Sequence, residues 1–164
     1  FVSPSCCRKA SDTFRREDIH KRRRRMQKEE KRKLIRAALE ARQRAYMPYS
    51  GYAVGAAVLM ESGKTYTGCN IENASYGATN CAERTALFKA VSEGERKCTA
   101  IAIAGGKAGS APADYAYPCG ICRQVMWEFG GQDLPVFVAK SEDDYREYTL
   151  GGLLPYGFGG ENLV

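Results

Sequence analysis

The spacing of apolar residues changes from helical to extended near Pro48. From about Gln27, apolar residues recur with the three-to-four-residue spacing of an amphipathic helix. Pro48 is expected to end that helix, because proline disfavours the helical conformation in the residue before it. The next stretch predicts a hairpin, with a buried apolar strand at 54–60, a glycine-containing turn at 61–64 and a return strand at 65–71.

The rest of the chain alternates between helical and strand patterns. The order is a helix from Cys81 that ends by Gly94, a strand at 99–104, a loop at 105–117, a helix at 119–129 and a strand at 135–139. An acidic turn and a candidate fifth strand follow. A hairpin followed by alternating helices and strands predicts an α/β fold: a three-layer α/β/α sandwich around a mixed, mainly five-stranded sheet.

The net charge of +6 is unevenly distributed along the chain. Residues 1–33 contain 13 Lys and Arg against 5 Asp and Glu, whereas residues 34–164 contain 12 against 14. We therefore expect a basic, flexible extension at 1–28 and one catalytic domain at 29–164. The arginine-rich run at 21–25 is either a solvated extension or a nuclear-localisation or nucleic-acid patch. The domain itself is slightly acidic, so its charge does not predict a nucleic-acid partner.

Cysteine usage and hydropathy both favour a reducing compartment. An odd number of cysteines with one C-x-x-C pair is unlike the disulfide framework of a small secreted protein. No apolar run approaches the roughly 18–20 residues of a membrane helix, and the N-terminal residues lack the apolar core of a signal peptide. We expect a cytoplasmic protein, with the nucleus as an alternative, and no membrane partner. The seven cysteines are Cys6, Cys7, Cys69, Cys81, Cys98, Cys119 and Cys122.

Four residues of the domain have the chemistry of a catalytic zinc site. Cys81, Cys119 and Cys122 supply three thiolates, and Glu83 supplies a carboxylate two residues after the first cysteine. Catalytic zinc sites use three protein ligands and leave the fourth position to water, whereas structural sites are closed by four. Both cysteine clusters fall where a helix is expected to begin, and the positive end of a helix favours thiolate over thiol. Glu83 is the expected proton carrier for the water.

Three thiolates over-neutralise a zinc ion, so we expect a neighbouring positive charge to compensate. Arg84 and Arg123 each follow one of the cysteine clusters and are the candidates. The single histidine, His20, lies in the basic extension, which leaves the domain an all-thiolate site. The alternatives are a redox motif and a structural zinc site closed by Cys69 or Cys98, but Glu83 would have no purpose in a structural site.

From about Leu34 to Leu163, the chain resembles the small homotetrameric zinc-dependent cytidine deaminases. The resemblance implies one zinc ion per subunit and deamination of free cytidine and 2′-deoxycytidine to uridine and 2′-deoxyuridine, with release of ammonia, as in pyrimidine salvage. It also implies a homotetramer whose sites form at subunit interfaces. The segments that carry it are Pro48–Ala57, Cys69–Gly77, Cys81–Ala86 and Pro118–Gln124.

The resemblance also implies roles for individual residues in nucleoside binding. Asn70 and Glu72 resemble the pair that binds the ribose hydroxyls, although a polar strand end has the same composition. Ala82 is implied to read the base through its backbone, with Glu83 holding N3. Phe158 resembles the aromatic residue that reaches a neighbouring subunit's site, although its spacing alone suits a core position. Tyr52 departs from the family, which usually has phenylalanine there against the pyrimidine, and its added hydroxyl needs a partner.

Three other functions are compatible with parts of this pattern. A blasticidin-type deaminase would act on a related aminopyrimidine, but Asn70 and Glu72 argue against it. An RNA-editing deaminase would use the basic extension to hold a polynucleotide, for which the acidic domain offers no evident channel. A non-enzymatic zinc protein would need four protein ligands on the metal.

Overall fold

A computed structural model describes residues 26–163 of the chain. Its contacts divide the chain into two units, residues 1–31 and 32–164. Within the first unit, the Gln27 amide donates to the Glu30 carboxylate over 2.8 Å, where helix α2 begins. The expected basic extension at 1–28 lies almost wholly outside the described residues.

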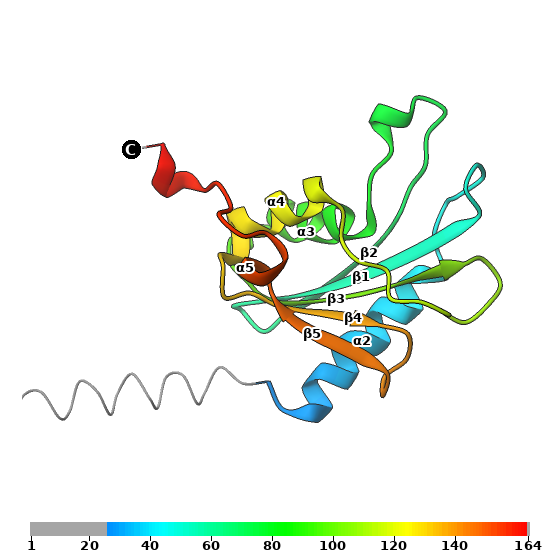
Figure 1. Ribbon diagram of the computed structural model, residues 1–164, viewed down its shortest axis with the longest axis horizontal. Coiled ribbons are helices and arrows are strands. Elements are labelled where there is room, and N and C mark those ends of the chain that lie inside the picture. The colour runs from blue at the N-terminus through cyan, green and yellow to red at the C-terminus, as the bar shows by residue number, and fades with distance from the viewer. Residues whose placement is uncertain (1–25, 164) are drawn as a thin grey trace, which may run out of the picture. The chain divides into compact units, whose positions relative to one another are not determined.

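The second unit is built on one mixed sheet of five strands in the order β2-β1-β3-β4-β5 (Figure 1). β1 pairs antiparallel with both β2 and β3, β3 pairs parallel with β4, and β4 pairs antiparallel with β5. This confirms the α/β fold and the mixed five-stranded sheet. The strands are β1 (Tyr52–Met60), β2 (Thr65–Cys69), β3 (Cys98–Lys107), β4 (Pro135–Ala139) and β5 (Tyr145–Thr149).

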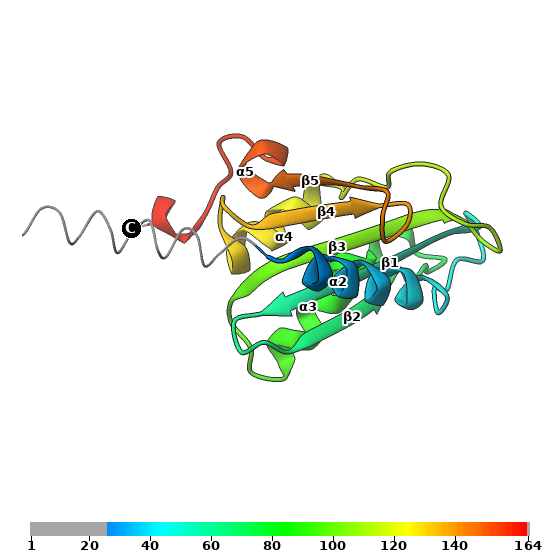
Figure 2. The same cartoon turned by 90° about the horizontal axis from the view of Figure 1, so that it is seen from below.

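Helices cover both faces of the sheet. α2 lies on one face, and α3 and α4 lie together on the other (Figure 2). α3 connects β2 to β3 and α4 connects β3 to β4, as expected for crossovers between parallel strands. The helices are α2 (Lys28–Arg42), α3 (Ala82–Ser92), α4 (Gly120–Gly130) and α5 (Leu150–Leu153), with short 3-10 turns at Tyr76–Ala78 and Gly160–Asn162.

Two glycines let the helices approach the sheet closely. A Cβ at Gly55 of β1 would overlap the backbone of α2, reaching 2.8 Å from the Arg42 Cα atom. A Cβ at Gly68 of β2 would overlap the backbone of α3, reaching 2.6 Å from the Ala82 carbonyl oxygen. Gly68 pairs with Ala56, so the two glycines alternate along the hairpin and serve opposite faces of the sheet.

The main hydrophobic core lies between the sheet and the α3–α4 layer. Its buried members come from all the central elements, including Val58 of β1, Leu87 of α3, Ile101 of β3, Met126 of α4 and Val136 of β4. α3 is therefore fixed along its length, and so is the cysteine at its start. None of the helices in the described part of the chain is long and apolar enough to cross a membrane.

The largest differences from the expected boundaries are at the end of α2 and at the end of β3. α2 ends at Arg42, before Pro48, because the chain leaves the helix to pair with the segment after β2. There the Tyr46 amide donates to the Asn70 carbonyl over 3.0 Å. β3 extends to Lys107, three residues beyond the expected strand, because these residues continue the pairing with the start of β1.

Gly68→Ala is expected to destabilise the protein by about 3 kcal/mol, since the added methyl group overlaps the backbone of α3 and the helix must shift. Gly77→Ala is the matched control, because nothing lies within 4 Å of a Cβ at that position. The urea midpoints of both variants measure the difference. Equal midpoints would contradict the close approach of α3 to β2.

Candidate active site

The site lies where α3 and α4 begin. β2 and β3 both run antiparallel to β1, so they run parallel to each other, and the helices that follow them begin at the same edge of the sheet. Cys81 is the N-cap of α3 and Cys119 is the N-cap of α4, both with extended backbone conformations. Cys122 lies one helical turn after Cys119, so its side chain points to the same side of α4.

The three cysteine side chains meet at one point. The Sγ atoms of Cys81 and Cys119 are 3.9 Å apart, and those of Cys81, Cys119 and Cys122 all lie within 4.8 Å of one another. Two thiolates bound to one tetrahedral zinc at about 2.3 Å would place their sulfur atoms about 3.8 Å apart. The number, type and spacing of these donors therefore fit a zinc ion with one open position.

The other two cysteines of the described domain bond elsewhere. The Cys69 thiol donates to the Arg44 carbonyl over 3.2 Å, and the buried Cys98 thiol donates to the Ala100 carbonyl over 3.4 Å. Burial raises the pKa of Cys98 to about 12, so it stays a thiol at neutral pH. Neither belongs to the group that can hold a metal ion within residues 26–163, so neither closes the site as a fourth ligand.

Cys81 is stabilised as a thiolate. Hydrogen bonds from the Cys122 thiol, from Arg84 and from Cys119 lower the pKa of Cys81 to about 5, against the opposing effect of burial. The Arg84 guanidinium donates to the Cys81 sulfur over 3.6 Å and to the Thr79 carbonyl over 3.2 Å. Its Nε atom is buried without a partner among the described residues. Arg84 therefore lies beside a cysteine sulfur, as predicted for a residue that compensates the negative charge of the thiolates.

Glu83 points into the protein and is only 4% exposed. Burial raises its pKa to about 7, and the neighbouring negative charge of Cys81 adds to the effect. A carboxyl group with that pKa can both accept and return a proton near neutral pH. This property suits the proton-carrying role predicted for Glu83.

Arg123 has different partners from those expected of a charge-compensating residue. Its Nε atom donates to the Pro118 carbonyl over 2.8 Å, and its Nη1 atom donates to the Leu153 carbonyl over 2.6 Å. The Pro118 carbonyl immediately precedes Cys119. In this structure Arg123 thus ties the entry of α4 to the C-terminal segment, and its hydrogen bonds go to backbone oxygens instead of sulfur.

The residues predicted to bind ribose lie beside the path into α3. Ile71, between Asn70 and Glu72, exchanges two backbone hydrogen bonds with Asn80, which precedes Cys81. These bonds place the predicted ribose-binding segment next to the cysteine cluster. Asn80 was not among the site residues predicted from the sequence.

Asn70 and Glu72 are held by the start of β1. The Asn70 side chain donates to the Tyr52 carbonyl over 2.9 Å and accepts from the Val54 amide over 2.8 Å. One Glu72 carboxylate oxygen accepts from the Tyr49 amide over 2.9 Å and from the Ser50 amide over 3.2 Å. Bonds from the Ser50 side chain and the Tyr49 amide lower the pKa of Glu72, so it is a carboxylate at neutral pH.

The remaining predicted substrate-binding residues differ in burial. Ala82 is fully buried as the first residue of α3, and its side chain has no polar atom. Tyr52 is 41% exposed and Phe158 is 55% exposed. The Phe158 carbonyl accepts from the Gln124 side chain of α4 over 2.7 Å, which holds this residue over the helix that carries Cys122.

A latch at the start of α3 was missed by the sequence reading. The Thr85 hydroxyl donates to the Cys81 carbonyl over 3.1 Å and accepts from the Asn80 side chain over 3.0 Å. It fixes the turn that presents Cys81. A threonine four residues after a cysteine at an expected helix start is the sequence signal that indicates such a bond.

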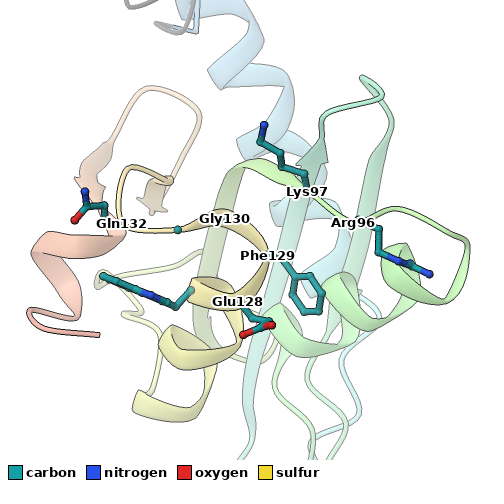
Figure 3. Close-up of a pocket in the computed structure, with 8 residues that line it drawn as sticks. Arg96, Lys97, Glu128, Phe129, Gly130 and Gln132 are labelled. Carbon is teal, nitrogen blue, oxygen red and sulfur yellow. The ribbon is translucent and has the colours of Figure 1, made fainter. Parts of the chain in front are cut away.

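A separate hollow of about 570 Å³ lies at the opposite ends of α3 and α4 (Figure 3). Trp127 and Phe129 line it together with two cations that already have partners. Lys97 pairs with Glu61 over 2.7 Å, and Arg96 donates to the Val91 carbonyl over 2.7 Å. None of the predicted site residues lines this hollow.

A mixed sheet with two helices that bring three cysteines and a buried glutamate to one edge defines the class of zinc-dependent nucleobase deaminases. Within that class, the chain belongs to the family described as the cytidine and deoxycytidylate deaminase zinc-binding region, whose model matches residues 28–138. The zinc cofactor is thus shown by the family together with the cysteine cluster.

Similar proteins cover nearly the whole of the domain. The cytidine deaminase of Halalkalibacterium halodurans is 50% identical over 130 residues, which are 79% of this chain and 95% of the relative. The cytidine deaminase of Sporosarcina psychrophila is 48% identical over 131 residues, or 80% and 93% of the two chains.

Solved structures of the family have the same fold. The crystal structure of cytidine deaminase from Burkholderia pseudomallei matches with a TM-score of 0.68 and 49% identity, covering 76% of this chain and 96% of that one. The enzyme from Mycobacterium tuberculosis matches with a TM-score of 0.66 and 43% identity, covering 77% and 94%.

Arg84→Gln is expected to raise the pKa of Cys81 by at least about one unit in metal-depleted protein, because the thiolate loses its cationic partner. The pH dependence of iodoacetamide alkylation at Cys81, followed by peptide mass spectrometry, measures this pKa. Arg123→Gln is the matched variant, and it should leave the titration of Cys81 in place because its bonds go to carbonyls. An unchanged titration in Arg84→Gln would show that Arg84 does not stabilise the thiolate.

Proposed function

We propose that the protein hydrolyses free cytidine and 2′-deoxycytidine to uridine and 2′-deoxyuridine, releasing ammonia. The observation that carries this proposal is the buried Glu83 beside three cysteines whose sulfur atoms lie within 4.8 Å of one another. It is supported by relatives named cytidine deaminase that are 50% and 48% identical. Conversion of a free nucleoside also suits a place in pyrimidine salvage.

Cys81, Cys119 and Cys122 would hold the zinc ion. A zinc ion with three protein ligands supplies Lewis acidity and lowers the pKa of a water molecule, which allows attack at C4 of the pyrimidine near neutral pH. Glu83 would take one proton from the water and deliver it to N3, and would then carry the second proton, from the hydroxyl group added at C4, to the leaving amine. Its raised pKa suits both directions of transfer, because neither protonation state dominates near pH 7.

Asn70 and Glu72 are proposed to bind the ribose. The Asn70 amide group is hydrogen-bonded to the backbone of β1, and the Glu72 carboxylate is hydrogen-bonded to the backbone of the turn before β1. These bonds fix the orientation of both side chains. An amide oxygen and an NH₂ group can each take a second hydrogen bond, and a carboxylate has about four acceptor sites, so both residues can still bind a hydroxyl group. The Ala82 backbone and the Tyr52 ring would contact the base.

A homotetramer is proposed, with Phe158 reaching the site of a neighbouring subunit. The support is its 55% exposure while its backbone is held on α4. Several other large side chains on the loops that border the site are also exposed, which is expected of a surface covered by another subunit. They include Tyr46, Tyr49, Ile71 and Tyr76.

An RNA-editing activity is not favoured, because the matched relatives are named cytidine deaminases. A blasticidin-type specificity is not favoured either, given Asn70 and Glu72 beside the site. The five described cysteines are free, which supports the proposal of a reducing, cytoplasmic or nuclear location.

Glu83→Gln is expected to lower kcat for cytidine by about 10²–10⁴-fold with zinc retained, because the amide keeps the shape of the side chain and cannot carry the proton. Ammonia release and zinc content measure the two effects. Glu40→Gln, on the exposed side of α2, is the matched control and should keep both. Turnover that survives in Glu83→Gln would overturn the assignment.

Hybrid assemblies test the place of Phe158. Phe158→Ala and Glu83→Gln are each expected to be weakly active, but a coexpressed mixture should recover about one quarter of wild-type activity. The active sites in the mixture would combine Glu83 of a Phe158→Ala subunit with Phe158 of a neighbouring Glu83→Gln subunit. Activity no greater than the mean of the two parents would indicate that Phe158 does not serve a neighbouring site.

A further inference from the structure

The segment between β3 and α4 is bound to the edge strand β5. This segment leaves β3 at Lys107 and returns past β5 to Cys119 (Figure 2). The segment packs closely on β3 at Gly105, where a Cβ atom would lie only 2.6 Å from the Cβ atom of Ala116. Its two tyrosines, Tyr115 and Tyr117, both contact residues of β5 or of the turn before it.

Arg146 of β5 contacts both tyrosines. Its guanidinium carbon lies 4.2 Å from the centre of the Tyr115 ring, and its Nη1 atom donates to the Tyr117 hydroxyl over 3.0 Å. A planar guanidinium can stack on a ring and donate at its edge at the same time, which a lysine ammonium cannot do. One arginine thus fixes two residues of the segment.

Further contacts hold the same two tyrosines. The Tyr117 hydroxyl shares a hydrogen bond of 2.9 Å with the Tyr148 hydroxyl, and the two rings meet edge to face at 5.7 Å. Tyr148 lies two residues after Arg146, so both side chains are on the face of the sheet that carries α4. The Tyr115 hydroxyl donates to Asp144, which also pairs with Lys140 over 2.8 Å.

Tyr117 is two residues from Cys119. The residue between them, Pro118, is buried, has a restricted backbone, and gives its carbonyl to Arg123. Cys119 is the exposed member of the cysteine cluster, whereas Cys122 is buried inside α4. Of the three sulfur atoms, the one of Cys119 therefore depends most on how this segment is held.

We propose that Arg146 is a positioning residue for the zinc site: by clamping Tyr115 and Tyr117 to β5, it holds Cys119 at the distance from Cys81 that zinc requires. The inference rests on the proposed function only in that the three cysteines bind zinc. Arg146 contacts neither the metal ligands nor a substrate, and its effect reaches the site through the backbone of 117–119.

The test is the rate at which the full-length zinc protein loses its metal to the chelator 4-(2-pyridylazo)resorcinol. Arg146→Gln removes the stacked cation and the donor, and we expect zinc loss to become several-fold faster, up to about the 10-fold that loss of a direct partner of a metal ligand costs in metal affinity. Arg146→Lys keeps the charge and one donor, so it should be intermediate. Turnover per bound zinc should stay near the wild-type value.

Arg36→Gln is the matched control. Arg36 makes two hydrogen bonds to Glu142, at 2.8 and 2.7 Å, in the turn between β4 and β5, so its loss weakens the same hairpin without touching the tyrosines. It should lower thermal stability slightly and leave zinc loss unchanged. Tyr117→Phe keeps the ring contact but removes the hydroxyl that Arg146 binds, so it should also speed zinc loss. It serves as the test variant if Arg146→Gln does not fold.

Zinc loss at the wild-type rate in Arg146→Gln and Tyr117→Phe would overturn the proposal, as would an equal acceleration in Arg36→Gln. Failure of the proposed function is seen separately, as a wild-type protein that binds zinc and does not deaminate cytidine. In that case the comparison of zinc loss among the variants still decides the role of Arg146.

Discussion

Three thiols within 4.8 Å of one another cannot all ionise without positive charge nearby, and the whole site depends on how that charge is supplied. The fold supplies it by placing Cys81 and Cys119 at the N-caps of two helices that begin at one edge of the sheet. Arg84 adds a cation 3.6 Å from the Cys81 sulfur. The pKa of Cys122 is raised, because its thiol donates to Cys81 and is buried. Without metal the site thus holds a Cys81 thiolate bonded by the Cys122 thiol, and metal binding releases the proton of Cys122.

This requirement explains Gly68 of the hairpin. Cys81 reaches the other sulfur atoms only if α3 lies close to β2, and Gly68 permits that approach by leaving space for the Ala82 carbonyl. The latch from Asn80 and Thr85 then fixes the first turn of the helix. Glu83 follows Cys81 by two residues, so the same packing buries the carboxylate and raises its pKa. The close packing of α3 on β2 therefore both positions Cys81 for the metal and raises the pKa of Glu83.

The chemistry was predictable from the sequence because it depends on residue type and short spacing. A cysteine two residues before a glutamate, and a C-x-x-C pair at the next helix start, are local patterns, and so are the alternating helices and strands. Much of what was missed depends on partners far apart in the chain, whereas the missed bond from Thr85 to the Cys81 carbonyl is local. Arg123 was expected beside sulfur and bonds to the Leu153 carbonyl instead, 30 residues away. The early end of α2 has the same origin, since Tyr46 leaves the helix to pair near Ile71.

On our proposal, the catalytic and substrate-binding parts of the site differ in how they are completed. Glu83 is 4% exposed, so folding of one chain is enough to bury it and set its pKa. The two aromatic residues assigned to the base are 41% and 55% exposed, so one chain leaves them in water. Assembly is then required to exclude water from the base, whereas the zinc site forms without it. A dissociated subunit would consequently keep its zinc and lose turnover, whereas a subunit lacking the Arg146 clamp would lose zinc faster even when assembled.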